Sequence, residues 1–296
     1  MSFEIDGKTM REIQQKSFEM AQFFVDFCKE HNLLCYFCGG CCIGAVRGGG
    51  FVPWDDDIDF FMPRPDYERL IEIFNKLSGS DSYYLQVTSD DIITKSQFAT
   101  ICDNSTTYIK TYMADLDINH GLSLDIIPLD GRPKKGRFYS FHRKMQNIYA
   151  LCYSLFIIGE APENHGRLVN TAAKIILGIF HTKSIRRKLW KFAQKKMTRY
   201  DFYESDYVCE LTTGPVYMRR DYPKEWFERA VGMSFEGVEM PIPVGYDKYL
   251  TMAFGDYMTE PPESERTYHH DYEYIDMNKP YTEYKGIYYC KGENGK

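Results

Sequence analysis

A short acidic segment at residues 54–59, which reads Trp-Asp-Asp-Asp-Ile-Asp, carries the side chains best suited to chemistry. On a β-strand, side chains two positions apart point to the same side. Asp57 and Asp59 therefore share one face, while the apolar residues that alternate with them enter the core. Paired carboxylates can hold Mg²⁺ against phosphates and polarise an attacking hydroxyl in phosphoryl or nucleotidyl transfer. The pattern predicts that Asp57 and Asp59 bind Mg²⁺, with Mn²⁺ as an alternative ion.

Asp125 is the third acid of the predicted site, because it lies inside the apolar run Leu-Asp-Ile-Ile. An aspartate inside a strand is costly unless it is paired or binds a metal. If this strand lies beside the first, three carboxylates converge in the kind of oxygen-ligand set that Mg²⁺ prefers. The ordinary alternative for the run of three acids is a solvated turn. The apolar alternation favours the metal site, and it leaves Asp55 and Asp56 as loop residues without an assigned role.

A glycine pair, Gly39 and Gly40, stands between a strand-like apolar run and a short helical segment. Glycine lets the backbone N–H groups approach a phosphate closely, and the N-terminus of a helix favours the negative charge. A glycine pair alone is not specific. Together with the downstream acids, it favours a site where the backbone can approach a phosphate.

The elements expected around these residues alternate between strands and helices and then turn helical, which indicates an α+β fold with a helical insertion. We expect a catalytic core over residues 1–136, a basic helical subdomain over 137–203, and a Tyr/Pro-rich part over 204–296 that packs back on the core. The last ninety residues predict only short irregular elements. Expected helices cover 10–31, 41–46, 65–77 and most of 137–203, and expected strands cover 33–38, 58–62, 83–87, 98–103 and 122–128.

Charge is segregated along the chain. The net charge is −6, yet residues 165–199 contain ten Lys or Arg and no Asp or Glu, so the remainder carries −16. Such a basic amphipathic stretch predicts contact with anionic membrane headgroups. A solvated pair of basic helices is the alternative, and the acidic remainder argues against binding of nucleic acid.

Nine cysteines, an odd number, occur without a visible signal peptide. This usage predicts reduced thiols and a cytoplasmic protein, peripheral to the inner membrane face where the basic stretch meets it. No apolar run is long enough to span a bilayer. Cys35, Cys38, Cys41 and Cys42 lack a second pair at zinc-ribbon spacing, so we expect them to be small buried apolar side chains rather than zinc ligands.

Two stretches, residues 38–47 (Cys-Gly-Gly-Cys-Cys-Ile-Gly-Ala-Val-Arg) and 50–59 (Gly-Phe-Val-Pro-Trp-Asp-Asp-Asp-Ile-Asp), resemble the signature of the LicD family. LicD proteins are phosphocholine-transferase-like members of the nucleotidyltransferase superfamily, to which fukutin-related protein also belongs. The likeness extends from about residue 10 to residue 270 and implies a nucleotidyltransferase-type mixed β-sheet flanked by helices. Further stretches that are similar to the family are residues 62–67, 125–130, 254–258, 261–262 and 269–270.

The resemblance also implies roles for single residues. Asp57 and Asp59 would be the metal-binding pair, and Asp125 would be a third ligand or the base. Gly39 and Gly40 would cradle the donor phosphates. Three further residues are expected to bind substrate: Arg47 at the developing phosphate charge, and Arg266 and His269 at a phosphate or the acceptor, with surface or structural roles as the alternative for the last two.

The activity that the resemblance implies is transfer of phosphocholine, or a similar phospho-alcohol, from CDP-choline or a related CDP-alcohol to a sugar hydroxyl. The acceptor would be a cell-surface glycan precursor, lipid-linked, as in modification of lipopolysaccharide or teichoic acid. Choline favours an aromatic and acidic pocket, which C-terminal tyrosines such as Tyr268, Tyr272 and Tyr274 could supply. The alternatives are a true nucleotidyltransferase, a CDP-polyol phosphotransferase, and a non-catalytic member that binds a nucleotide or a glycan.

Overall fold

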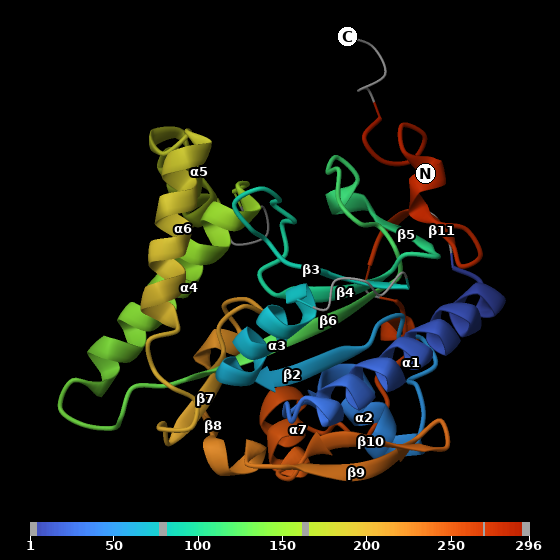
Figure 1. Ribbon diagram of the computed structural model, residues 1–296. Helices are drawn as coiled ribbons and strands as arrows, with labels where there is room; N and C mark the ends of the chain where they lie inside the picture. Colours follow the sequence, from blue (N-terminus) through green and yellow to red (C-terminus); the bar gives the residue numbers. More distant parts are fainter. Residues whose placement is uncertain (1–4, 77–81, 162–165, 269, 292–296) are drawn as a thin grey trace. The chain divides into compact units, whose positions relative to one another are not determined.

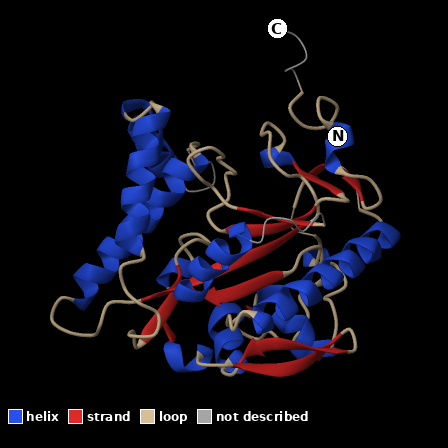
Figure 2. Cartoon of the chain, viewed as in Figure 1, coloured by secondary structure: helices blue, strands red, loops and turns tan. Residues whose placement is uncertain are grey.

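The chain folds into two compact units in this computed structural model, which describes residues 5–76, 82–161, 166–268 and 270–291 (Figure 1). Unit 1 consists of Met1–Gln86, Ala99–Ile127 and Glu225–Lys296, and unit 2 of Val87–Phe98 and Pro128–Lys224. Helices and strands alternate from α1 (Gly7–Glu30) to β3 (Tyr83–Gln86), and further strands follow as far as β6 (Ser123–Gly131). Figure 2 shows the helices and strands of both units. The predicted α+β class, a mixed sheet with helices, is confirmed.

Unit 1 is built on a sheet whose strands follow the order β1-β2-β6-β4-β3. Burial alternates over residues 57–60: Ile58 and Phe60 are fully enclosed, whereas Asp57 and Asp59 are half-buried. The rest of β2 is buried on both sides. β2 and β6 are neighbours, as the prediction about Asp125 required. The strands are β1 (Tyr36–Phe37), β2 (Asp59–Pro63), β3 (Tyr83–Gln86), β4 (Ala99–Asp103) and β6 (Ser123–Gly131).

Four α-helices belong to unit 1. The first begins after Asp6, whose side chain accepts a hydrogen bond from the backbone N–H of Thr9 at 2.7 Å. This is a standard N-cap, and it places the start of the helix three residues earlier than predicted. Its apolar face packs on the sheet, with the ring of Phe24 edge-on to Phe60 at 4.8 Å. The helices are α1 (Gly7–Glu30), α2 (Gly39–Gly48), α3 (Arg64–Lys76) and α7 (Tyr246–Phe254).

Two further antiparallel strand pairs lie in unit 1 outside the main sheet. β9 (Ala230–Phe235) and β10 (Val238–Pro243) form a hairpin. β5 (Thr107–Lys110) pairs with β11 (Tyr272–Asp276), with a bulge between Tyr272 and Tyr274. The pairing of β5 with β11 brings the C-terminal part of the chain beside the acidic segment.

Unit 2 contains α4 (Tyr139–Ile158), α5 (Arg167–Ile179) and α6 (Lys183–Met197), which share an apolar core (Figure 1). β7 (Tyr207–Glu210) pairs with the end of β6 and with β8 (Tyr222–Pro223). These three helices confirm the predicted helical character of this stretch.

Several sequence-based boundaries differ from the structure. The strand predicted over 33–38 is limited to Tyr36–Phe37, because the N–H of Leu33 bonds to the carbonyl of Cys28 at 2.8 Å and is used outside the sheet. The prediction of irregular structure after residue 204 was wrong for the hairpin, α7 and β11. The predicted end of the third helix at Leu77 lies outside the described residues. In the described part of the chain, every helix is too short or too polar to span a bilayer.

Candidate active site

Asp55 and Asp56, left without a role by the sequence, are the most deeply buried acids of the segment. Asp55 is 6% exposed and Asp56 is 1% exposed. They still lie in a loop, ahead of β2, but they face inward. Burial and the neighbouring carboxylates of Asp57 and then Asp56 raise the pKa of Asp55 well above its usual range. The whole segment is therefore part of the site rather than a solvated turn.

The backbone of the acidic loop is fixed from distant parts of unit 1. The side-chain amide of Gln14 on α1 donates to the carbonyl of Asp55 at 3.0 Å. The hydroxyl of Tyr108 on β5 donates to the carbonyl of Asp56 at 2.9 Å. Preorganisation of this kind holds catalytic groups in position before substrate binds.

Two buried tyrosines hold the carboxylate of Asp56. The hydroxyl of Tyr272 donates to Asp56 Oδ2, and the hydroxyls of Tyr108 and Tyr272 are also hydrogen-bonded to each other. Burial and then the nearby acid or phenol raise the pKa of both tyrosines, so both remain protonated donors. Tyr272 is fully buried, which leaves no room for it in a choline pocket.

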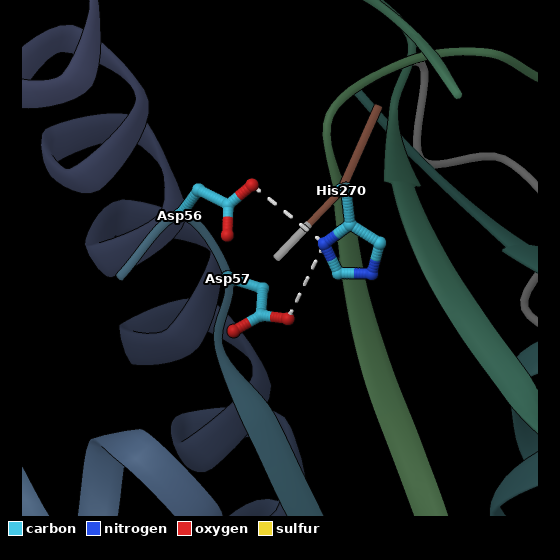
Figure 3. A group of neighbouring side chains, drawn as sticks. All are labelled: Asp56, Asp57 and His270. Carbon is cyan, nitrogen blue, oxygen red and sulfur yellow. Dashed lines mark ion pairs between the residues drawn. The ribbon is translucent and has the colours of Figure 1, made fainter. Parts of the chain in front are cut away.

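His270 faces two of the acids, Asp56 and Asp57, with the same ring nitrogen (Figure 3). Its Nδ1 is 3.6 Å from Asp56 Oδ2 and 3.8 Å from Asp57 Oδ2. Asp56, Asp57 and His270 therefore form a group of potential metal ligands. In the described ranges it is the one group of three His, Cys, Asp or Glu side chains whose possible ligand atoms all lie within 4.8 Å of one another. Nδ1 is buried and has no hydrogen-bond partner within the described part of the chain. Two carboxylates and an imidazole nitrogen that has no partner among the described residues form a candidate metal site.

Crowding of negative charge extends from this group to Asp59. Burial, followed by the charges of Asp57, Asp125 and Asp55, raises the pKa of Asp59 well above its usual range. Burial also raises the pKa of Asp57, against the lowering effect of His270. A raised carboxyl pKa means that the ionised cluster is short of positive charge, which a bound cation would supply.

Asp125 lies directly beside the start of β2, since its N–H donates to the carbonyl of Ile58 at 3.2 Å. Its Oδ1 accepts from the hydroxyl of Thr100 at 3.0 Å, and its Oδ2 lies 3.9 Å from the Nζ of Lys110. Lys110 is 7% exposed. Burial lowers its pKa, but Asp125, Tyr112 and the other acids more than compensate and hold the pKa above its ordinary value. Lys110 is therefore a fixed positive charge inside the acidic cluster.

Gly39 and Gly40 begin α2 directly against the acids. A Cβ on Gly40 would lie 1.9 Å from Asp55 Oδ2, and one on Gly39 would lie 4.0 Å from Asp59 Oδ2. Gly39 also has a φ of +53°, which glycine adopts without strain. Its N–H donates to the hydroxyl of Tyr249 at 3.1 Å. The close approach of Asp55 explains why a side chain is excluded at residue 40.

The other predicted substrate-binding residues occupy different places. Arg47 donates to the backbone carbonyls of Tyr257 and Thr259. Arg266 forms an ion pair with Glu260 at 3.0 Å. Its guanidinium also lies 5.2 Å from the ring centre of Trp54. His269 lies outside the described residues.

A cavity of about 570 Å³ opens beside Trp54, the residue that precedes the acids. Phe51, Tyr268 and Arg266 also line it, together with residues from the start of α1 that include Asp6. Tyr268 is two residues before His270, so one chain segment connects this cavity to the acidic group. Of the three tyrosines considered for choline binding, Tyr268 is the one that lines the cavity.

The four clustered cysteines are all buried, as expected for small apolar side chains. Burial raises the pKa of Cys41, as do the charges of Asp55 and Asp59, and burial alone raises the pKa of Cys42. The group of potential ligands around His270 contains no cysteine in the described residues. Cys41 Sγ donates to the carbonyl of Asp57 at 3.6 Å, which connects the start of α2 to the acidic loop.

Acids on neighbouring strands, with a glycine-started helix beside them, define a nucleotidyltransferase-type fold and site. Comparison with known proteins gives the family: residues 32–144 match the family described as LicD/FKTN/FKRP, nucleotidyltransferase domain. This match confirms the resemblance to that family found in the motifs, and the chain is a phosphotransferase of the LicD/nucleotidyltransferase type. It is 28% identical over 270 residues to "Lipopolysaccharide cholinephosphotransferase LicD" of Haemophilus influenzae, which covers 88% of this chain and 96% of that protein.

Proposed function

We propose that the enzyme transfers phosphocholine from CDP-choline to a sugar hydroxyl of a lipopolysaccharide or related cell-surface glycan precursor. The observation that carries the proposal is similarity to a cholinephosphotransferase over nearly all of that protein's length. The buried group of acids, lysine and histidine supports a reaction at a phosphate. Since the glycan precursor would be lipid-linked, we propose that the enzyme works at the cytoplasmic face of the membrane. We propose no role for nucleic acid in this reaction.

Asp56, Asp57 and His270 would hold the metal ion, with Asp59 beside them. When bound, Mg²⁺ or Mn²⁺ would neutralise the negative charge of the donor's diphosphate. The carboxylates of Asp57 and Asp59, on one face of the strand, would fix the position of that ion. Asp125 was expected as a third ligand or as the base, and its contacts with Thr100 and Lys110 favour the base.

The chain's own groups would act on the proton and on the leaving group. Asp125 would take the proton of the attacking sugar hydroxyl, and the sugar oxygen would form a bond to the choline-bearing phosphorus. The bond from that phosphorus to the bridging oxygen would break, and CMP would leave with the electron pair. Lys110 would stabilise the negative charge on CMP, a role expected from Arg47 by sequence. Gly39, at the start of α2, would let the backbone approach the donor phosphates, whereas Gly40 makes room for the carboxylate of Asp55.

The cavity beside Trp54 would receive the choline head group. Trp54, Phe51 and Tyr268 supply aromatic surface, and Asp6 supplies a negative charge. Arg266 and Arg11 also line the cavity, and their positive charges are offset by ion pairs with Glu260 and Glu236. A quaternary ammonium group binds favourably in such surroundings. Tyr268→Ala should therefore raise the KM for CDP-choline while kcat changes little, and an unchanged KM would remove the head group from this cavity.

The reaction is tested by incubating the protein and Mg²⁺ with CDP-choline, CDP-glycerol and CDP-ribitol, with and without a glycan acceptor. Release of CMP with CDP-choline as the preferred donor supports the proposal. Preference for a polyol donor, or release of pyrophosphate from a nucleotide triphosphate, would favour the alternative transferases. Asp57→Asn should abolish CMP release, and full activity in that variant would refute the carboxylate site. Nucleotide binding without turnover of any donor would indicate a binding protein.

A further inference from the structure

Helix α5 presents a stripe of apolar side chains to solvent. Leu168 is 88% exposed, Ile175 is 57% exposed and Ile179 is 64% exposed. At roughly 100° per residue, the stripe spans about a third of the helix circumference. The exposed apolar residues of α5 are Leu168, Val169, Ala172, Ile175, Ile176 and Ile179.

This stripe is distinct from the face that α5 uses for folding. Ala173 and Leu177 are buried, and Leu177 belongs to the apolar core that α4 and α6 share. A surface helix of a globular protein usually needs one apolar face. The exposed stripe therefore contributes nothing to the packing of unit 2 and points to a partner.

Helix α6 adds positive charge beside more exposed apolar surface. Ile185, Lys188, Phe192 and Lys195 follow one another at helical spacing, and all four are exposed. Arg186 has a different task, because its Nε donates to the carbonyl of Phe180 just after the end of α5 at 2.9 Å. With no acid between residues 165 and 199, the exposed surface of these helices has one sign of charge.

We propose that α5 lies in the interface of an anionic bilayer, with its apolar stripe among the acyl chains and the lysines of α6 at the lipid headgroups. Apolar contact combined with basic charge is the pattern of interfacial helices. A nucleic acid would satisfy the lysines but would leave the stripe exposed to water. A second copy of the chain would bring two like-charged surfaces together. The inference gains its biological sense from the lipid-linked acceptor of the proposed function, but binding to lipid needs no substrate.

The test is co-sedimentation of the full chain with phosphatidylcholine vesicles, alone and with phosphatidylglycerol, in the absence of donor and acceptor. We expect binding to the anionic vesicles and little to the neutral ones. Leu168→Ser, Ile175→Ser and Ile179→Ser combined should weaken partitioning by about a hundredfold or more. Lys188→Gln with Lys195→Gln should weaken it by roughly fivefold per lysine.

The matched control is Val216→Ser, which removes an apolar side chain that is 65% exposed in unit 2 outside these helices, and which should bind like the parent. Thermal unfolding and CMP release from CDP-choline without vesicles should be unchanged in all variants. Binding that ignores phosphatidylglycerol, or that survives the triple substitution, would overturn the proposal. The proposal would also be overturned if neither the parent nor any variant sedimented with vesicles and the parent formed a dimer that the triple substitution dissociated. Failure of the proposed transfer reaction would leave these sedimentation results unaffected.

Discussion

Replacing Gly40 with alanine should separate α2 from the acidic loop. The added Cβ would lie 1.9 Å from Asp55 Oδ2, whereas real contacts of this kind essentially never fall below 3.0 Å, so one side must move by about 1.1 Å. The buried carboxylate of Asp55 has little room, because the loop carbonyl is held by Gln14. Overpacking of this size costs about 1–3 kcal/mol of folding stability. A displacement of about 1 Å at catalytic groups lowers the rate on the order of a hundredfold.

Gly48→Ala, at the other end of the same helix, is the control for this substitution. A Cβ on Gly48 would meet no atom within 4 Å, so stability should be unchanged or slightly higher. Urea unfolding gives the stability of both variants, and the initial rate of CMP release from CDP-choline gives their activity. If Gly40→Ala matched Gly48→Ala in both measurements, the close packing of Asp55 against α2 would be refuted.

Three further substitutions test the charges and hydrogen bonds. Lys110→Met should lower stability by about 3 kcal/mol, since Asp125 loses its buried partner. The same change should tighten Mn²⁺ binding, measured by electron paramagnetic resonance, because a competing positive charge is gone; weaker binding would contradict this. Tyr272→Phe removes a donor from buried Asp56 and should cost about 1–3 kcal/mol in urea unfolding, and an unchanged midpoint would show that the bond contributes nothing. Burial raises the pKa of Glu210 to about 7. Because a raised folded-state carboxyl pKa makes ionisation unfavourable, the ionisation of Glu210 should lower stability between about pH 4.5 and 7, and Glu210→Gln should make that fall shallower. A parent protein with flat stability over that range would contradict the assignment.

Local periodicity explains why the sequence predicted part of the site. The alternation of Asp57 and Asp59 with Ile58 and Phe60 depends only on strand geometry, so it holds wherever the strand packs. Asp125 was expected at the site only if its strand lay beside the first, and β2 and β6 are neighbours. Strand periodicity therefore identifies which side chains share a face, but not which strands are neighbours.

The rest of the site depends on contacts between residues far apart in the sequence. Tyr272 is 216 residues from Asp56, to which it is hydrogen-bonded. Without that contact, Asp56 resembles any acid in a turn. The position of His270 has the same origin. It lies just before β11, and the pairing of β5 with β11 is a contact between distant parts of the chain.

The same pairing makes the site a cooperative structure. The loop before β2 contributes negative charge that is unfavourable when buried alone. Lys110, from β5, and His270, just before β11, contribute groups that have little reason to be buried without those acids. The acidic loop and the pair Lys110 and His270 therefore stabilise each other. Their contact depends on the pairing of β5 with β11, which lies outside the main sheet. A change that weakens the pairing of β5 with β11 should loosen the acids before it affects the core of unit 1. This explains how substitutions far from Asp57 in the sequence can act on the chemistry.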